Sequence, residues 1–247
     1  MNNKPIIALA QIKYFDTATT NNLKKIIRYI RLAKEKGADI ICFPESCLYK
    51  SSLELDNKFV KQISEECKKN SIWCIITDDL KKDGKTYNTS LLIDRKGIIK
   101  GGYKKIHLYG DNTLAGNKSQ VFKTDFGKVG IAICWDLAFP ELFQKMKKRG
   151  AQIVFCPSQW WYDSGVHFEN RKKREKEILR ALVLARAYEN VFFLALCNPV
   201  TGAMHQISYS AISSPVRILK EISGRQGLIV QKINLDEIKK IQKIYDS

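Results

Sequence analysis

The sequence predicts an α/β fold in which strands and helices alternate around mixed sheets. Strand-like apolar segments alternate with amphipathic helix-like segments through roughly the first 200 residues, a pattern typical of layered α/β domains. Turn signals between residues 80 and 104 add antiparallel hairpins. With 247 residues, of which 45% are hydrophobic, the chain is long enough to bury one large core. We therefore expect residues 1–247 to form a single domain.

The first part of the chain predicts a strand, a helix, a strand, a second helix and a third strand. Between residues 21 and 37, apolar residues recur at helical spacing, and Gly37 then provides a normal helix stop. The apolar residues are Leu23, Ile26, Ile27, Ile30 and Ala33. The strands are expected at 5–12, 38–45 and 71–77, and the second helix at 57–70.

The middle of the chain predicts two hairpin strands, because the turn sequences KKDGKT and DRKG flank the apolar segments 87–93 and 98–103. After a loop at 107–120, we expect a strand at 128–133, a short helix from about Pro140 to Arg149, a strand at 151–157 and a long helix over about 170–189. In that long helix, Ile178, Ala181, Leu182 and Ala185 stand at helical spacing. The last expected elements are strands at 191–198, 206–212, 216–222 and 227–233 and a helix at 235–244.

The composition limits the class of protein. Lysine and arginine (42 residues) exceed the 25 acidic residues, but the lysines are spread along the whole chain and no recognisable nucleic-acid module accompanies them. No nucleic-acid partner is therefore expected, and the positive field favours anionic substrates. No apolar run approaches the roughly 18 to 20 residues of a membrane span, and the first residues lack a signal-peptide cleavage site. These features predict a cytoplasmic protein without a membrane partner.

Cysteine and histidine usage argues against disulfides and metals. Seven cysteines are an odd number in a chain with no export signal, which indicates a reducing compartment. There is no Cys-x-x-Cys pair, and the three histidines lie far apart in the sequence. We expect neither a metal nor a cofactor.

Three predicted strands deliver a reactive side chain at their carboxyl ends, where α/β sheets commonly place their sites. They are followed by Glu45 in IICFPES, by Lys104 and Lys105 in YKKIHLYG, and by Cys134 in IAICWD. A thiol, an amine and a carboxylate form a working set for acyl transfer. A lysine cation favours the cysteine thiolate, and a carboxylate can accept its proton. Lysine and the backbone N–H of Trp135 could also stabilise a tetrahedral oxyanion, while Glu45 protonates the leaving amine and activates water.

The segments FPES, YKKIHL and GIAICWDLAFPE, in that order, closely resemble the nitrilase superfamily of carbon-nitrogen hydrolases. The resemblance continues in VFCPSQW, in LRALVLARAYENVFFLALCN and in SYSAISSP, and so covers nearly the whole chain. It implies an α-β-β-α sandwich, a homodimer or higher homo-oligomer, and a catalytic triad of Glu45, Lys105 and Cys134. Lys104 is the alternative lysine, but side chains alternate along an extended segment, so only one of the two should face the site.

The chain departs from the family pattern at one position. Members of the family generally place a second glutamate between the lysine and the cysteine, whereas here only Asp111 and Asp125 are acidic in that interval. Asp111 could replace the glutamate with a shorter reach, or it could be an ordinary loop aspartate.

Several neighbouring residues have candidate roles. Trp135, Trp160 and Trp161 could contact substrate, although large aromatic residues are equally often plain core packing. His107 is expected to be a structural hydrogen-bonding residue, and Arg186 and Glu189 are expected to form a structural ion pair.

These observations predict a cysteine-dependent hydrolase of a small linear amide or N-carbamoyl compound that works through a thioester and releases ammonia or an amine. Nitrile hydrolysis is the first alternative, because it uses the same residues. A catalytically silent binding protein with a basic surface is the alternative from another class, and steep salt dependence of its binding would identify it.

Overall fold

The computed structural model describes residues 3–15, 20–163, 165–166 and 169–245. Its strands form two mixed sheets. The first has the order β13-β1-β2-β4-β5-β6, with β3 beside β4, and the second has the order β12-β11-β10-β9-β8-β7. The first sheet contains β1 (Ile6–Gln11), β2 (Ile40–Cys42), β3 (Leu53–Glu54), β4 (Trp73–Lys82), β5 (Lys85–Ile93), β6 (Ile99–Lys104) and β13 (Gly227–Lys232). The second contains β7 (Val121–Lys123), β8 (Lys128–Ile131), β9 (Ile153–Pro157), β10 (Phe193–Cys197), β11 (Tyr209–Ser213) and β12 (Ile218–Ser223).

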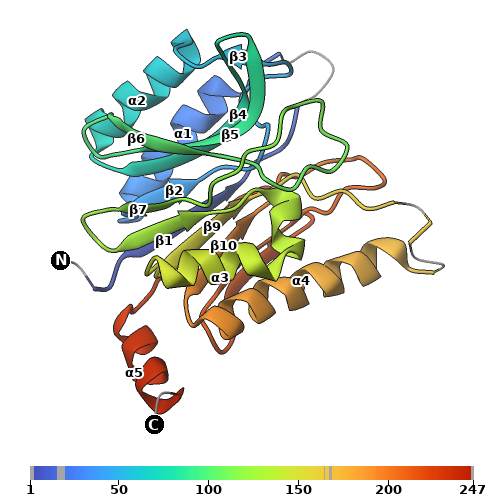
Figure 1. Ribbon diagram of the computed structural model, residues 1–247. Coiled ribbons are helices and arrows are strands. Elements are labelled where there is room, and N and C mark those ends of the chain that lie inside the picture. Colours follow the sequence, from blue (N-terminus) through green and yellow to red (C-terminus); the bar gives the residue numbers. More distant parts are fainter. Residues whose placement is uncertain (1–2, 16–19, 164, 167–168, 246–247) are drawn as a thin grey trace.

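The two sheets pack face to face, and helices cover their outer faces (Figure 1). Helices α1 (Leu23–Glu35) and α2 (Lys58–Asn70) lie on the first sheet, and α3 (Pro140–Lys148) and α4 (Arg171–Asn190) lie on the second. Helix α5 (Asp236–Tyr245) follows the last strand near the C-terminus. This arrangement confirms the predicted α-β-β-α sandwich.

Parallel and antiparallel pairs occur in both sheets, as the hairpin signals predict. In the first sheet β2 lies parallel to β1 and β4, whereas β4, β5 and β6 form an antiparallel meander. In the second sheet β9 lies parallel to β8 and β10, whereas β7 and β11 pair antiparallel with their neighbours. Since the strands β2 and β8 each have a neighbour on both sides, their carboxyl ends can deliver side chains into the space between the sheets.

The structure corrects the sequence reading in three places. The long strand β4 continues to Lys82, five residues beyond the predicted end at Thr77, because it pairs with β5 along its whole length. The buried apolar residues of α4 are Leu179, Val183 and Ala187, whereas Ile178 is 44% exposed. The short strands β3 and β7 were not expected, since two or three residues carry no periodic signal.

No helix within the described part of the chain is both long and apolar enough to span a membrane.

Candidate active site

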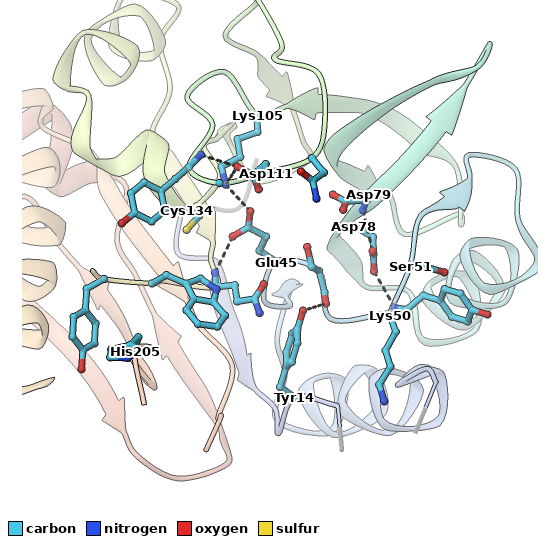
Figure 2. Close-up of a pocket in the computed structure, with 18 of the residues that line it drawn as sticks. Tyr14, Glu45, Lys50, Ser51, Asp78, Asp79, Lys105, Asp111, Cys134 and His205 are labelled. Atoms are coloured by element: carbon cyan, nitrogen blue, oxygen red, sulfur yellow. Dashed lines mark hydrogen bonds and ion pairs between the residues drawn. The ribbon is translucent and has the colours of Figure 1, made fainter. Parts of the chain in front are cut away.

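The three predicted reactive segments meet in one cavity between the sheets. Glu45 follows β2, Lys105 follows β6, and Cys134 begins the short 3-10 helix η1 (Cys134–Ala138) after β8. All three side chains line a cavity of about 690 Å³, a size suited to a small organic molecule. Figure 2 shows Cys134 and Lys105 on the same side of Glu45. Sequence reasoning therefore located residues that the fold brings together from both sheets.

The Glu45 carboxylate is buried, and both of its oxygens are hydrogen-bonded. Oε1 accepts from Lys105 Nζ and from Asn88 Nδ2, each at 2.9 Å. Oε2 accepts at 2.9 Å from the backbone N–H of Gln159, which lies in the loop after β9 of the second sheet. These three donors fix the carboxylate in one orientation, which is the geometry that a general base requires.

Lys105 is only 2% exposed and lies between two carboxylates. Its Nζ atom is 2.9 Å from Glu45 Oε1 and 2.9 Å from Asp111 Oδ2. Burial opposes the ammonium form, but the negative charges of Glu45 and Asp111, together with the hydrogen bond to Glu45, outweigh that penalty and raise the pKa of Lys105. The lysine therefore stays cationic at every working pH.

The neighbouring Lys104 points away from the cavity. Its Nζ atom lies 3.3 Å from the centre of the Tyr87 ring, and its side chain is exposed. This separation is the expected result of side-chain alternation at the end of β6.

Cys134 has an unusual backbone conformation. Its φ angle of +48° lies in the left-handed region, which costs roughly 1 kcal/mol or more for a residue with a side chain. The turn ends β8 sharply and leaves the thiol lining the cavity. Ser46, which directly follows Glu45, has a similar φ of +49°. No residue-type signal in the sequence predicts either turn.

The Cys134 thiol is protonated at neutral pH. Burial and the Glu45 charge raise its pKa to about 12, although the Lys105 charge opposes them. A thiolate must therefore form as the thiol transfers its proton to a neighbouring base.

A polar network supports the turn that carries Cys134. Asp136 is fully buried and accepts hydrogen bonds from Tyr103 Oη, from His107 and from the Ile133 N–H. The structural role predicted for His107 is confirmed, since its ring also stacks on Phe139 at 3.7 Å.

Arg186 holds the far end of the same turn. Its guanidinium donates to the carbonyl oxygens of Leu137 and Ala138. The predicted ion pair with Glu189 is present at 3.1 Å.

Asp111 lies beside Lys105 and is not a remote loop residue. Besides its ion pair with Lys105, its Oδ2 atom accepts from the backbone N–H of Tyr109 at 2.8 Å. Asp125, the other acid in the interval, pairs instead with Arg95 and the Trp73 indole. Of the two acids, the fold brings only Asp111 to the cavity.

The three predicted tryptophans have different surroundings. Trp161 lines the cavity and is 42% exposed. Trp160 is buried instead, with its indole N–H donating to Glu175 at 2.6 Å. Trp135 packs against Trp160 and Tyr109 and, like Trp160, is not among the described lining residues. Successive side chains point to opposite sides of an extended segment, so Trp160 and Trp161 cannot both face the cavity.

Other residues in or beside the cavity were not anticipated from the sequence. Asp78 and Asp79 of β4 line the wall on the other side of Glu45 from Cys134, and Tyr14 contributes from the segment after β1 (Figure 2). Asn88 of β5 binds Glu45. These residues stand within or beside strands with no distinctive motif, and only β-sheet pairing brings them to the site.

Within the described residues, no group of three or more histidine, cysteine, aspartate or glutamate side chains has the geometry to hold a metal ion.

Comparisons with known proteins show the family and the fold of this chain. The family model described as carbon-nitrogen hydrolase matches residues 6–243. The chain is 28% identical to a probable nitrilase of Schizosaccharomyces pombe over 91% of this chain and 87% of that protein. It is 26% identical to a 2-oxoglutaramate amidase of Bacillus subtilis over 91% of this chain and 88% of that protein. A similar solved structure is a mutant amidase from Nesterenkonia with the acetamide moiety of fluoroacetamide covalently added at its active-site cysteine. The two structures match with a TM-score of 0.82 at 21% identity, over 98% of this chain and 96% of that one.

Proposed function

Because the chain belongs to the carbon-nitrogen hydrolase family, we propose that it hydrolyses small linear amides or N-carbamoyl compounds with Cys134 as the nucleophile. The observation that carries this proposal is that a thiol, a buried carboxylate and a buried ammonium group line one cavity. Named relatives support amides, since they include a 2-oxoglutaramate amidase and a deaminated glutathione amidase. Nitrile hydrolysis would use the same residues through a thioimidate and is the less favoured alternative.

In the first step, Cys134 attacks the carbonyl carbon while its proton passes to Glu45. The bond between sulfur and carbon forms, and the carbonyl oxygen takes up negative charge. Lys105 and the Trp135 backbone N–H stabilise that oxyanion, a contribution worth roughly 100- to 1000-fold in rate for each donor. The raised pKa of Cys134 makes this proton transfer necessary, since little thiolate exists beforehand.

In the second step, the intermediate collapses and the carbon–nitrogen bond breaks. Glu45 returns the proton to the leaving nitrogen, which departs as ammonia or an amine. A water molecule then gives a proton to Glu45 and attacks the thioester, and the thiol is restored as the acid is released. Asp111 acts through Lys105 by holding its ammonium group between two carboxylates.

We also propose that the protein works as a homodimer or higher homo-oligomer in the cytoplasm. Apolar side chains that are more than half exposed on α4 and α5, Tyr188 and Tyr245, favour self-association. Size-exclusion chromatography with light scattering tests the oligomer, since a monomeric mass at micromolar concentration would contradict it.

The decisive experiment measures ammonia release by the wild type and by Cys134→Ala over a panel of simple amides, carbamoyl amines and nitriles. We expect release by the wild type only. Cys67→Ala is the matched control, because Cys67 is buried in α2 away from the cavity and should leave activity unchanged. Equal activity of Cys134→Ala and wild type, or no wild-type activity on any member of the panel, would contradict the proposal.

A further inference from the structure

The charge of the cavity is opposite to the charge of the chain. The chain carries a formal net charge of +17. Among the described lining residues, however, five carboxyl groups accompany only two lysines and no arginine. The carboxyl groups belong to Glu45, Asp78, Asp79, Asp111 and Asp163. Burial raises the pKa of Asp78 to about 8, but the other four carboxyl groups still outnumber the two lysines, so a substrate meets a negative field inside the cavity.

The two lysines do not neutralise the carboxyl groups that line the cavity. Lys105 is already shared by Glu45 and Asp111. Lys50 is exposed at the cavity surface, where its ammonium group lies 5.9 Å from the centre of the Phe15 ring. Among the described lining residues, the one buried cation, Lys105, is thus already paired with two carboxylates when the anionic end of a substrate arrives.

Asp79 is the carboxylate best placed to meet a substrate. It pairs with Asn88 in the register of β4 and β5, so it shares a sheet face with the amide that binds Glu45. Figure 2 shows Asp79 on the side of Glu45 that is away from Cys134. A linear molecule with its amide at Cys134 can therefore extend past Glu45 toward Asp79.

Asp79 also differs from the other lining acids because one of its carboxylate oxygens is buried without a hydrogen-bond partner among the described residues. Its Oδ1 atom is buried and receives no hydrogen bond from any described residue. Asp78, in contrast, accepts from the backbone N–H groups of Leu48, Tyr49 and Asp79 itself. A buried carboxylate oxygen without a donor is costly, and a cation bound beside it removes that cost.

The electrostatics of Asp79 point the same way. Burial raises its pKa, the charges of Glu45 and Asp111 raise it further, and only Lys105 opposes them. The cavity therefore holds a destabilised carboxylate, and a cation that binds beside it is stabilised by Glu45, Asp79 and Asp111 at once.

We propose that the cavity selects linear amides or carbamoyl compounds whose far end carries a protonated amine, and that the Asp79 carboxylate binds this ammonium group. The inference rests on the proposed function, because it assigns the far end of the same substrate. It also means that the overall positive charge of the chain does not predict the charge of the substrate.

Binding to the Cys134→Ala variant tests the inference separately from catalysis. Isothermal titration calorimetry would compare 5-aminopentanamide, hexanamide and the monoamide of glutaric acid, which have chains of similar length and a cationic, a neutral and an anionic end. We expect 5-aminopentanamide to bind about 10- to 100-fold more tightly than hexanamide, and the glutaric monoamide to bind most weakly. The same order is expected for kcat/KM of the wild type.

Asp79→Asn identifies the residue responsible. In the Cys134→Ala background it should remove most of the preference for 5-aminopentanamide while changing the affinity for hexanamide less than about threefold. Asp163→Asn is the matched control, since Asp163 lines the same cavity but is exposed, and this variant should retain the preference. Thermal melting of both variants checks that they fold.

The possible failures are distinguishable. Equal binding of the three amides, tighter binding of the anionic one, or a preference that survives Asp79→Asn would overturn this inference, while Cys134-dependent hydrolysis of hexanamide would still support the proposed function. No Cys134-dependent hydrolysis of any amide, carbamoyl compound or nitrile would overturn the proposed function and the inference with it.

Discussion

The two sheets bring different chemistry to the same cavity. The first sheet supplies the charged groups, since Glu45, Lys105 and Asp79 all belong to its strands or to the residues that follow them. The second sheet supplies a neutral thiol on a strained turn and the backbone N–H of Gln159. In the first sheet, ion pairs balance the charges of the buried groups. In the second sheet, the backbone conformation sets the position of the Cys134 thiol. The comparison teaches that the site exists only where the two sheets pack together.

The largest expected effect comes from removing the buried cation of the first sheet. Lys105→Met keeps much of the side-chain volume but leaves Glu45 and Asp111 without their shared ammonium group. We expect kcat for a simple amide to fall about 100- to 1000-fold, because the oxyanion loses a donor. The neighbouring variant Lys104→Met is the control, and its turnover should stay within about twofold of wild type. Similar losses in both variants would contradict the assignment of Lys105.

A smaller loss is expected at the acid that positions this cation. Asp111→Ala should lower kcat about 10- to 100-fold, since the variant loses one charge-assisted contact and Lys105 keeps the other. Asp125→Ala serves for comparison, because Asp125 pairs with Arg95 outside the cavity and its loss should reduce stability more than turnover. Near-wild-type turnover of Asp111→Ala would show that this aspartate has no part in the reaction.

The thiol of the second sheet can be tested by its reaction with iodoacetamide. Because burial and the Glu45 charge place the pKa of Cys134 near 12, the thiolate fraction should rise about tenfold for each pH unit between pH 7 and pH 10. Mass spectrometry of the alkylated peptide gives the rate at Cys134. Glu45→Gln should lower the pKa of Cys134 and speed its alkylation at a fixed pH. A rate for the wild type that reaches a plateau below about pH 9 would be inconsistent with this balance of charges.

The smallest effect concerns the scaffold behind the thiol. Arg186→Ala removes two hydrogen bonds to the carbonyl oxygens of Leu137 and Ala138 and should lower the free energy of unfolding by about 1–3 kcal/mol. Arg180→Ala breaks a half-exposed pair with Glu221 and should cost less than about 1 kcal/mol. Chemical denaturation measures both values. Equal costs would mean that the buried arginine does not stabilise the Cys134 turn.

Much of this carbon-nitrogen hydrolase was predictable from local patterns. The amphipathic helix after Asn22 and the hairpin turns near residues 83 and 96 depend on nearby residues alone, so periodicity and turn chemistry locate them. Glu45, Lys105 and Cys134 were located because each follows a predicted strand, and the fold brings all three to one cavity. The buried face of α4 was not predictable in this way, since Leu179 and Ile178 are equally apolar and only packing against the second sheet selects between them.

By itself, the sequence determined the alternation of strands and helices and the order of the three reactive segments. Tertiary structure decided that Trp161 and not Trp160 faces the cavity, whereas the family resemblance had already favoured Lys105 over Lys104. It also decided that a strongly basic chain encloses an acidic cavity, because Asp79 and Asp111 reach Glu45 and Lys105 only through sheet pairing and loop placement. The physical reason is the distance along the chain over which each effect acts. Periodicity and turns depend on residues that are near neighbours in the sequence, whereas burial and the electrostatic field inside a cavity depend on residues that are distant in sequence.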